Sequence, residues 1–393
     1  MGDRICLVSN EFPPSIGGVG QSVSRIAKML LKLGYEVHVA VLPVRSDAKA
    51  TDFNSFRFSS YQTSEQDGIF VHKIKASIMD KTWIPSLSES KFLADCYLQL
   101  KLLYSKYLFK IFHAFYITYP SYITTLVARE NGVPVINSVR GNDLYSDILS
   151  NWHSRIVWTL QNSSRITFVS KSLLEKAILF IPEIKNKSYV FYNSVEDIKN
   201  FNLPKSSISD NLKGLIIGSV GKFRYKKGIN FLIESCKLID TKFDFTLLLI
   251  GDFKKNELSY WQQEIENSGI KSKIILTGFL DRKEALKFLS YLDIFVIPSL
   301  HEGCPNAMLE AMVAGKAIIG TKVDAIGEIL EDGVDAILIN PASTDELISS
   351  LRKLASNAEL RHQLGCAARN KCLKQFNYSV EQKNWEELYK SLS

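Results

Sequence analysis

Short runs of apolar, β-branched residues alternate with amphipathic stretches along almost the whole chain. Continuous apolar runs of this length are typical of strands that are buried on both faces, and the stretches between them have helical spacing. The alternation therefore predicts an α/β fold in which helices cover both faces of parallel sheets. The predicted strands are 5–9, 36–42, 69–74, 110–115, 134–139, 165–169, 189–192, 214–220, 245–250, 273–277, 293–298, 317–321 and 336–339.

A polar stretch interrupts this series and divides the chain in two. Residues 200–213 contain Pro204 and a cluster of serines but few apolar side chains, which is typical of a linker. At 393 residues the chain is also too long for one comfortable core. We therefore predict two Rossmann-like, doubly wound domains, residues 1–199 and 214–377, and a terminal amphipathic helix at 378–393.

Two segments of the first half depart from the alternation. Residues 44–67 are polar and aromatic and show no clear helix or strand, and irregular stretches of this length are often functional. Residues 91–115 mix lysine, leucine, tyrosine and phenylalanine in an amphipathic pattern. That pattern fits an ordinary helix that buries its apolar side, or a face that rests on anionic lipid at a membrane.

Composition and charge narrow the class of protein. Hydrophobic residues make up 46% of the chain and charged residues 23%, as is usual in globular proteins. The formal net charge of +7 suits an anionic small molecule, a membrane surface or nucleic acid. The chain has no dense run of basic residues and no zinc-finger spacing, so we expect no nucleic-acid partner.

Cysteine usage and apolar run lengths bear on where the protein works. The six cysteines contain no Cys-x-x-Cys pair, which fits reduced thiols in a cytoplasmic protein. The first residues lack the pattern of a signal peptide, and no stretch reaches the roughly 18–20 apolar residues that span a bilayer. We expect a cytoplasmic protein, at most peripheral at the inner face of the membrane.

The strongest candidate chemistry lies in residues 299–315, which join a predicted strand to a predicted helix. Ligands of open α/β sheets bind at the carboxyl ends of strands, where a helix start offers N–H groups and a positive dipole to phosphate. Glu302 in the loop can hydrogen-bond sugar hydroxyls, and Glu310 on the helix can take both hydroxyls of a ribose. Alternatively, two glutamates at this spacing recur by chance in helix-rich proteins.

A second loop, residues 219–228, follows the first predicted strand of the second domain. It combines glycines with Lys222, Arg224 and Lys227, so it can neutralise a diphosphate and the charge that develops on it as a leaving group. The plainer interpretation is a solvated basic loop.

These two segments resemble the family-4 glycosyltransferases, whose mark is a Glu-x7-Glu motif in this strand–loop–helix context. Glu302 and Glu310 provide that motif here, and the resemblance implies that they contact the donor sugar and its ribose. Lys227–Gly228 matches the Lys-Gly end of the family's basic loop. Lys222 stands where the family usually has arginine, so either Lys222 suffices or Arg224 supplies the guanidinium.

The resemblance extends to the first loop of the chain, residues 9–20. Its Gly17–Gly18 pair matches the family's Pro-x-x-Gly-Gly type of loop, which reaches the donor phosphates. A dinucleotide-binding loop is the rival interpretation, but the Gly-x-Gly-x-x-Gly pattern is incomplete here. The plainest interpretation is a turn that requires a positive φ.

On the acceptor side the chain departs from the family, which often has His-Gly-x-Asp near the reacting centre. Arg140 replaces that histidine, and a permanently charged guanidinium cannot act as a general base near neutral pH. Arg140 can instead bind an anionic acceptor or phosphate. His113, which we place at a strand end, is the other candidate of the N-terminal domain, with a structural role as the alternative.

Three further segments match the family less closely. Asp324 and Ala325 stand where the family has two glycines in a Gly-Gly-x-x-Glu stretch, and Glu328 matches its glutamate. Gly251 and Phe279 match strand-end positions that shape the pocket of the nucleotide base, although both also suit simple turns.

The resemblance implies a GT-B fold, in which two Rossmann-like domains face each other across a cleft and helix 378–393 packs back on the N-terminal domain. It further implies retaining, metal-independent transfer of a hexose from a nucleotide-diphosphate sugar, with no separate cofactor, to a glycan or lipid-linked acceptor in surface polysaccharide or lipopolysaccharide biosynthesis. The residues expected to hold the donor are Gly17, Gly18, Lys222, Arg224, Lys227, Gly251, Phe279, Asn306, Ala307, Met308, Leu309 and Glu310, and those expected to act in transfer are Glu302, Lys227, Lys222, Arg140 and His113.

Two other functions remain open from the sequence. One is a different GT-B reaction, such as that of a sugar-nucleotide epimerase or a phosphorylase. The other is an inactive partner subunit that binds a sugar nucleotide. The intact glutamate pair argues against the second, while the replaced histidine and glycines argue mildly for it.

Overall fold

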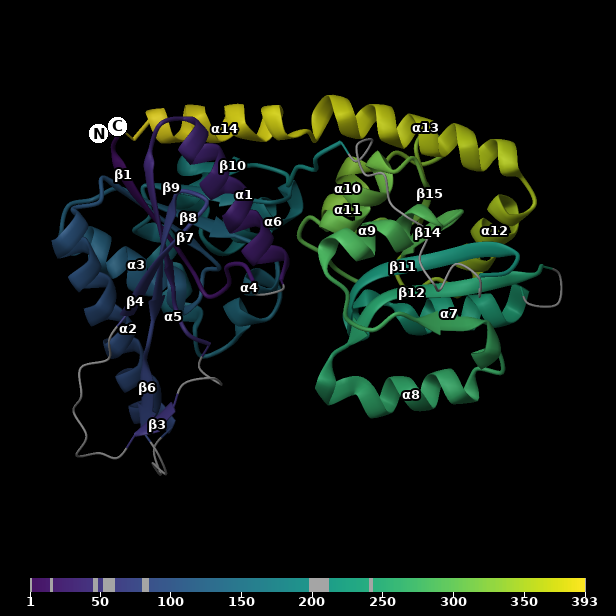
Figure 1. Ribbon diagram of the computed structural model, residues 1–393, viewed down its shortest axis with the longest axis horizontal. Helices are drawn as coiled ribbons and strands as arrows, with labels where there is room; N and C mark the ends of the chain where they lie inside the picture. The colour runs from purple at the N-terminus through teal and green to yellow at the C-terminus, as the bar shows by residue number, and fades with distance from the viewer. Residues whose placement is uncertain are drawn as a thin grey trace. The chain divides into compact units, whose positions relative to one another are not determined.

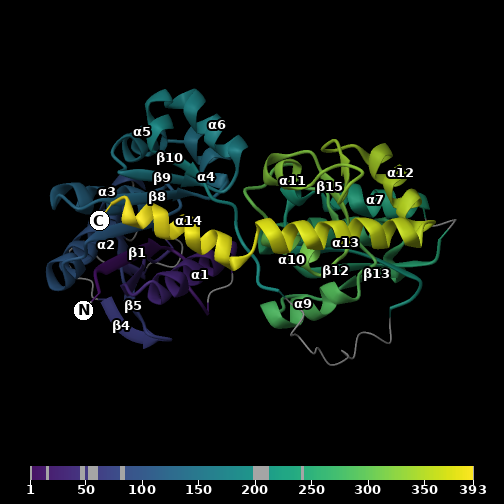
Figure 2. The ribbon, with the colours of Figure 1, turned by 90° about the horizontal axis from the view of Figure 1, so that it is seen from above.

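The chain forms two compact units (Figures 1 and 2). One consists of Met1–Phe191 together with Gln382–Ser393, and the other of Tyr192–Glu381; each is described by itself below. The chain passes between the units at Phe191–Tyr192, and most of the expected linker, residues 200–211, lies outside the described part. The computed structural model describes residues 2–14, 17–44, 49–51, 61–79, 85–197, 212–239 and 243–392.

The first unit is built on an eight-stranded sheet, which is parallel except for one edge strand. Its strands are β1 (Arg4–Ser9), β2 (Glu36–Val41), β4 (Tyr61–Gln66), β5 (Ile69–Ile74), β7 (Ile111–Phe115), β8 (Val135–Val139), β9 (Arg165–Phe168) and β10 (Ser188–Val190). They lie in the order β10-β9-β8-β7-β1-β2-β5-β4. The seven strands predicted for this half are therefore all present, and the doubly wound α/β class is confirmed.

The edge strand β4 corrects the prediction that residues 44–67 contain no strand. It pairs antiparallel with β5, from Tyr61 opposite Ile74 to Gln66 opposite Ile69. Its sequence is entirely polar or aromatic and it lies at the solvent-facing edge, so it lacks the apolar signal of a buried strand. Two short strands, β3 (Lys49–Thr51) and β6 (Ser77–Met79), form a separate parallel pair. Residues 45–48 and 52–60 of this segment lie outside the described part.

Helices flank this sheet. They are α1 (Gly18–Lys32), α2 (Pro85–Tyr107), α3 (Tyr119–Glu130), α4 (Asn142–Tyr145), α5 (His153–Gln161), α6 (Lys171–Phe180) and the end of α14 (Tyr378–Lys390), with 3-10 turns η2 (Asp147–Leu149) and η3 (Pro182–Lys187). The helix α2 packs Phe92, Cys96, Leu100 and Leu103 into one core cluster with α3 and the sheet. Segment 91–115 is thus a core helix that runs into strand β7, and α2 also leaves Leu98 and Leu102 exposed.

The last helix, α14, places its residues from Gln382 onward in the first unit. Trp385 and Tyr389 are buried there, and the Trp385 ring packs edge-on against Phe191 with their centroids 4.9 Å apart. These two aromatic side chains are the apolar face that the spacing of this segment predicts. Within the described part of the chain, no helix combines the length and the apolar character that crossing a bilayer requires.

The second unit contains a six-stranded sheet whose strands are all parallel. They are β11 (Leu215–Phe223), β12 (Phe245–Phe253), β13 (Ile274–Leu276), β14 (Ile294–Ile297), β15 (Ala317–Thr321) and β16 (Ile337–Ile339), in the order β13-β12-β11-β14-β15-β16. All six strands predicted for this half are present. The strands β11 and β12 run three residues past their predicted ends, because they stay paired through Lys222 opposite Asp252 and Phe223 opposite Phe253.

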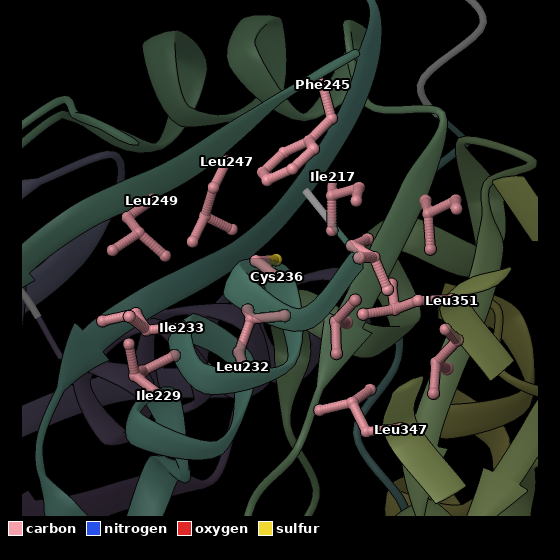
Figure 3. Close-up of a cluster of buried hydrophobic side chains, with 14 of the residues drawn as sticks. Ile217, Ile229, Leu232, Ile233, Cys236, Phe245, Leu247, Leu249, Leu347 and Leu351 are labelled. Atoms are coloured by element: carbon pink, nitrogen blue, oxygen red, sulfur yellow. The ribbon is translucent and has the colours of Figure 1, made fainter. Parts of the chain in front are cut away.

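Helices cover both faces of this second sheet. They are α7 (Ile229–Ile239), α8 (Leu258–Asn267), α9 (Arg282–Ser290), α10 (Asn306–Val313), α11 (Asp324–Ile329), α12 (Thr344–Ala355) and α13 (Ala358–Gln375), with 3-10 turns η6 (Tyr225–Lys227), η7 (Lys255–Glu257) and η8 (Lys271–Lys273). Figure 3 shows one face, where Leu247 and Leu249 of β12 meet Leu232 of α7 and Leu351 of α12. Alternate strand residues such as Leu248 point to the opposite face, where α9 contacts β11 and β12. The core therefore fixes the strands whose ends carry the candidate site.

A buried pair of histidines lies inside the first sheet. His38 Nδ1 and His72 Nε2 are 2.9 Å apart, and neither side chain is exposed. Glu36 lies 3.0 Å from the other nitrogen of His38, and Thr63 lies 2.9 Å from that of His72. Burial lowers the pKa of both histidines, that of His72 to about 4, where the charges of His38 and Lys106 lower it further. Both imidazoles are therefore neutral at pH 7.

This pair predicts acid sensitivity. The unfolded chain protonates a histidine near its ordinary pKa of 6.5, whereas folded His72 holds off the proton until about pH 4. The free energy of unfolding should therefore be at its full value above pH 6.5 and should decrease as the pH is lowered from 6.5 to 4. The decrease is about 1.4 kcal/mol per pH unit for each histidine that only the unfolded state protonates. Urea titrations at several pH values measure this. His72→Gln should flatten the dependence, and His362→Gln, at an exposed histidine, should not; equal slopes in all three proteins would contradict the prediction.

Candidate functional site

The order of strands in the second unit creates a switch point at one edge of its sheet. The strand β11 lies between β12 and β14, so the chain leaves β11 toward one side and the connection after β14 leaves toward the other. Loops diverge at such a switch point, and ligands of open α/β sheets bind there. The loop after β11 carries the basic motif and the loop after β14 carries the glutamate motif. The fold therefore brings the two strongest sequence signals together.

The two loops are joined through their backbones. The Leu300 N–H donates to the carbonyl of Lys226 over 2.8 Å. Gly228 has φ +66, and a Cβ built on it would lie 2.0 Å from the carbonyl oxygen of Pro298. Only glycine allows this approach, because any side chain would both strain the backbone and collide with Pro298. Position 228 therefore requires glycine for structural reasons, whether or not the basic loop contacts a ligand.

Glu302 lies at the centre of this junction and is 7% exposed. Its carboxylate forms an ion pair with the ammonium group of Lys227 and accepts a hydrogen bond from Ser299 Oγ over 3.1 Å. Burial raises the pKa of Glu302, but the charges of Lys227 and Lys226 and the two hydrogen bonds outweigh burial, and the net pKa lies below its usual value. Glu302 is therefore an anion at neutral pH and not a proton donor.

The second glutamate of the motif lies two turns into α10. Glu310 Oε1 accepts a hydrogen bond from Arg282 Nε over 2.9 Å, which fixes the carboxylate at the surface of the unit. Helix α10 begins after Pro305, and no side chain caps it. Asn306 and Ala307 therefore present backbone N–H groups at the helix start, as a phosphate site requires. The next two side chains, Met308 and Leu309, are fully buried, so only their backbone can meet a ligand.

The remaining predicted donor residues of this unit line the ends of neighbouring strands. Lys222 is exposed at the end of β11, opposite Asp252 of β12. Arg224 Nε is buried and makes no hydrogen bond within the described part of the chain. Gly251 has φ +130 and packs on the Gly221 carbonyl, where a Cβ would lie 2.0 Å from the oxygen. Phe279 follows β13 and is 56% exposed, so its ring is available for contact.

In the first unit, the glycine loop lies at the start of α1. Gly17 is the N-cap residue, with φ −164, so the interpretation as a positive-φ turn is wrong at this position. Its lack of a side chain instead makes room for Glu11, whose carboxylate oxygen lies 1.9 Å from where a Cβ would be. The same carboxylate accepts the Gly20 N–H over 3.3 Å. Gly18 has open space around it.

His113 corrects a second expectation. It is the third residue of β7 and not at a strand end, and it has no exposed surface. Its two ring nitrogens lie 2.7 Å from Tyr389 Oη and 2.7 Å from Ser138 Oγ. Burial, assisted by the nearby charge of Arg140, lowers its pKa well below the usual value. A neutral, enclosed imidazole with both nitrogens hydrogen-bonded links α14 to the sheet, and it cannot present an acceptor.

Arg140 follows β8, and its surroundings suit ligand binding better. Its guanidinium lies over the Phe115 ring, 5.0 Å from the centroid. The backbone N–H groups of Arg140 and Gly141 donate to the buried carboxylate of Asp143, over 3.0 and 2.7 Å. Asp143 thus shapes the loop after β8 and holds Arg140 at the carboxyl end of the sheet.

Sequence reasoning missed four residues that complete the site of the second unit. Ser299 and Lys226 lie inside the recognised motifs but have no family role attached to them. Arg282 begins α9, and Asp324 Oδ2 accepts a hydrogen bond from the Glu302 N–H over 2.7 Å. The one sequence signal was that Asp324 stands where the family has glycine, which indicates that its side chain makes a contact.

Comparison with known proteins agrees with this geometry. The family described as Glycosyl transferases group 1 matches residues 204–371, and the one described as Glycosyltransferase Family 4 matches residues 16–197. The fold and these matches define a glycosyltransferase with the GT-B fold. The chain belongs to glycosyltransferase family 4, as its glutamate motif indicates.

Three of the proteins similar in sequence to this chain show the range of the matches. An uncharacterized glycosyltransferase of Methanocaldococcus jannaschii is 26% identical and covers 91% of this chain and 90% of its own length. The N-acetyl-alpha-D-glucosaminyl L-malate synthase of Bacillus anthracis is 24% identical, with 96% and 94% covered. The lipopolysaccharide 1,2-N-acetylglucosaminetransferase of Salmonella typhimurium is 26% identical over 44% of this chain and 47% of its own.

Solved structures show the same fold over the whole chain. Sucrose-phosphate synthase from Thermosynechococcus elongatus has a TM-score of 0.78 at 17% identity, with 99% of each chain covered. Anabaena Alr3699/HepE, solved in complex with UDP, has a TM-score of 0.71 at 15% identity, with 99% of this chain and 100% of that one covered.

The contact between Gly228 and Pro298 predicts a difference between two glycines that both have positive φ. Gly228 has φ +66 and Gly269 has φ +76, but nothing lies within 4 Å of a Cβ on Gly269. Gly269→Ala should lower the free energy of unfolding by about 1–2 kcal/mol, the cost of the left-handed conformation. Gly228→Ala should lower it by roughly 1–3 kcal/mol more, because the methyl group overpacks the loop junction. Denaturant unfolding measures both, and equal losses would contradict the close approach.

Proposed function

We propose that this glycosyltransferase moves a hexose from a nucleotide-diphosphate sugar to a glycan or lipid-linked acceptor, with retention at the anomeric carbon and without a metal ion. Retention and metal independence follow from the family resemblance. Two observations support the donor class. Lys222, Lys227 and the start of α10 lie at the carboxyl edge of the second unit's sheet, and a protein of the same fold has been solved with UDP bound.

The observation that carries the proposal is the partly buried ion pair between Lys227 and Glu302. A buried charge without a partner is costly, so each of these groups neutralises the other in the absence of ligand. A diphosphate at the start of α10 offers Lys227 more negative charge than one carboxylate does. Lys227 then turns to the diphosphate, and the released carboxylate of Glu302 accepts hydrogen bonds from the hydroxyls of the donor sugar.

Glu310 and Arg282 hold the other end of the donor. A carboxylate has two acceptor oxygens and suits the two neighbouring hydroxyls of a ribose. Arg282 fixes the orientation of Glu310 before the donor arrives, which reduces the entropy that binding must overcome. Phe279 is exposed in the loop between β13 and α9, three residues before Arg282. Its ring provides an aromatic face for the base.

Transfer breaks the bond between the anomeric carbon and the diphosphate oxygen, and the electron pair remains on the nucleoside diphosphate. The acceptor oxygen forms the new bond to that carbon, and its proton leaves to the departing phosphate. Lys222, Lys227, Arg224 and the N–H groups of Asn306 and Ala307 stabilise the charge on the leaving group. None of these groups needs to titrate near neutral pH.

On the acceptor side, Arg140 binds an anionic group. A guanidinium at a strand end matches the phosphate of a lipid-linked acceptor. A role in surface polysaccharide or lipopolysaccharide biosynthesis is supported by the name of the Salmonella relative. Contact with a membrane and a cytoplasmic location stay predictions. The lysines of α2 give lipid contact little support, because Lys91 and Lys101 are paired with Asp95 and Glu130.

A screen of donors tests the proposal directly. Thermal unfolding is measured with UDP-glucose, GDP-mannose, ADP-glucose and dTDP-glucose. The matching donor at about 100 times its dissociation constant should add about 2.7 kcal/mol to the free energy of unfolding. If none of the four raises the unfolding temperature, a nucleotide-sugar site of this kind is contradicted.

Variants of the two glutamates should separate their roles. Glu310→Ala should weaken binding of the matching nucleoside diphosphate roughly 10- to 150-fold, since it removes charged hydrogen bonds to the ribose. Glu302→Gln should bind that nucleotide at least as tightly as the native protein, because it removes the anion that competes for Lys227, while transfer falls about 100-fold. Calorimetry and release of nucleoside diphosphate measure these effects.

The matched control is Glu266→Ala, at an exposed glutamate of the same unit that pairs with Lys271. It should change neither quantity. Weaker nucleotide binding by Glu302→Gln would contradict the exchange of partners at Lys227. Conversion of the donor in the absence of any acceptor would indicate an epimerase, and a complete lack of donor turnover would indicate an inactive binding subunit.

A further inference from the structure

Asp324 occupies a backbone conformation that glycine normally takes. It is the first residue of α11, shortly after β15, and has φ +43, in the left-handed region that side chains disfavour. Aspartate tolerates this region better than most residues, but glycine is the residue without a penalty there. Strained residues cluster where their side chains have a task. The contacts of Asp324 identify that task.

The carboxylate of Asp324 anchors the backbone of Glu302. Asp324 Oδ2 accepts the Glu302 N–H over 2.7 Å, which is a short, charge-assisted hydrogen bond. A second anchor lies close by, where Thr321 Oγ1 donates to the Ser299 carbonyl over 2.6 Å. Both contacts hold the loop after β14 to the end of β15. Glycine at position 324 would provide no acceptor for the Glu302 amide.

The two ends of Glu302 are therefore held by different parts of the unit. Its amide is held by Asp324, and its carboxylate is held by Lys227 and Ser299. Asp324 also acts on Lys226, whose pKa burial lowers and the charges of Glu302 and Asp324 raise. If the carboxylate of Glu302 exchanges Lys227 for the donor sugar, the hydrogen bond between the Glu302 amide and Asp324 can stay in place.

We propose that Asp324 is a positioning residue for sugar transfer: by holding the amide of Glu302, it keeps the carboxylate of Glu302 aimed at the donor sugar after Lys227 has turned to the diphosphate. The proposal rests on the function proposed above and deepens it. Asp324 acts through Glu302 and does not itself contact the donor.

Two substitutions separate the hydrogen bond from the backbone conformation. Asp324→Gly keeps the freedom to adopt positive φ and removes the acceptor. Asp324→Asn keeps an acceptor oxygen and still tolerates this conformation. With the donor that stabilises most among the four screened, Asp324→Gly should lower kcat about 10- to 100-fold and leave the donor KM within about threefold. Asp324→Asn should stay within about threefold of the native kcat. Loss of activity in both variants, or in neither, would overturn the proposal.

A double-mutant cycle tests whether Asp324 acts through Glu302. In the Glu302→Gln background, where transfer is slow but measurable, Asp324→Gly should cause less than about a twofold further loss, because the carboxylate it positions is already gone. A residue with a merely structural role would cause the same loss in both backgrounds, and that result would overturn the proposal.

Hydrogen exchange tests the anchor without any donor. The amide of Glu302, followed in a peptide that covers residues 299–309, should exchange at least about tenfold faster in Asp324→Gly than in the native protein or Asp324→Asn. Unchanged exchange would overturn the proposal. Asp324→Ala, which also lacks the acceptor, is the second variant if Asp324→Gly does not fold.

The two proposals fail in different ways. If Glu302→Gln keeps full transfer activity, the proposed function is wrong. If Glu302→Gln loses activity while Asp324→Gly keeps it, the proposed function stands and the role of Asp324 is wrong.

Discussion

The pairing of β11 with β14 is the constraint on which the candidate site depends. Ile217 and Gly218 of β11 lie in register with Ile294 and Phe295 of β14, although two strands and three α-helices intervene along the chain. Parallel neighbours end at the same edge of the sheet, so the loops that follow them meet there. The basic loop and the glutamate loop are adjacent for this reason alone, and the buried face shown in Figure 3 keeps the strands in that register.

Charge compensation determines which side chains of these loops pair with one another in the absence of a ligand. Lysines and carboxylates gathered at one partly buried edge must neutralise one another, because an isolated buried charge is expensive. Lys227 and Glu302 do so directly. In the first unit, Glu11 lies against the start of α1 in a similar way. In both units the protein's own carboxylate lies where a cation or a helix start favours an anion.

The errors of prediction have physical causes. The strand β4 is polar and lies at an edge, so backbone pairing with β5 holds it and its sequence has no apolar period to detect. The predicted strand 110–115 agrees with β7 to within one residue and already contains His113, so the placement of His113 at a strand end was a misreading of this strand and not an error in its bounds. Its partner Tyr389 is 276 residues away along the chain, and no local pattern can show such a contact. A solvent-side role for His113 therefore followed from a small local error.

The sequence alone determined the α/β class, the thirteen predicted strands, the two-unit organisation and the glutamate and lysine motifs at the strand ends, because apolar runs and loop composition are local properties. Tertiary structure decided which of the motif residues meet. It paired Lys227 with Glu302, gave Arg282 to Glu310 and placed the carboxylate of Asp324 on the Glu302 amide. Such contacts depend on strand order and on the direction of each side chain, and these are set only when distant segments pack together.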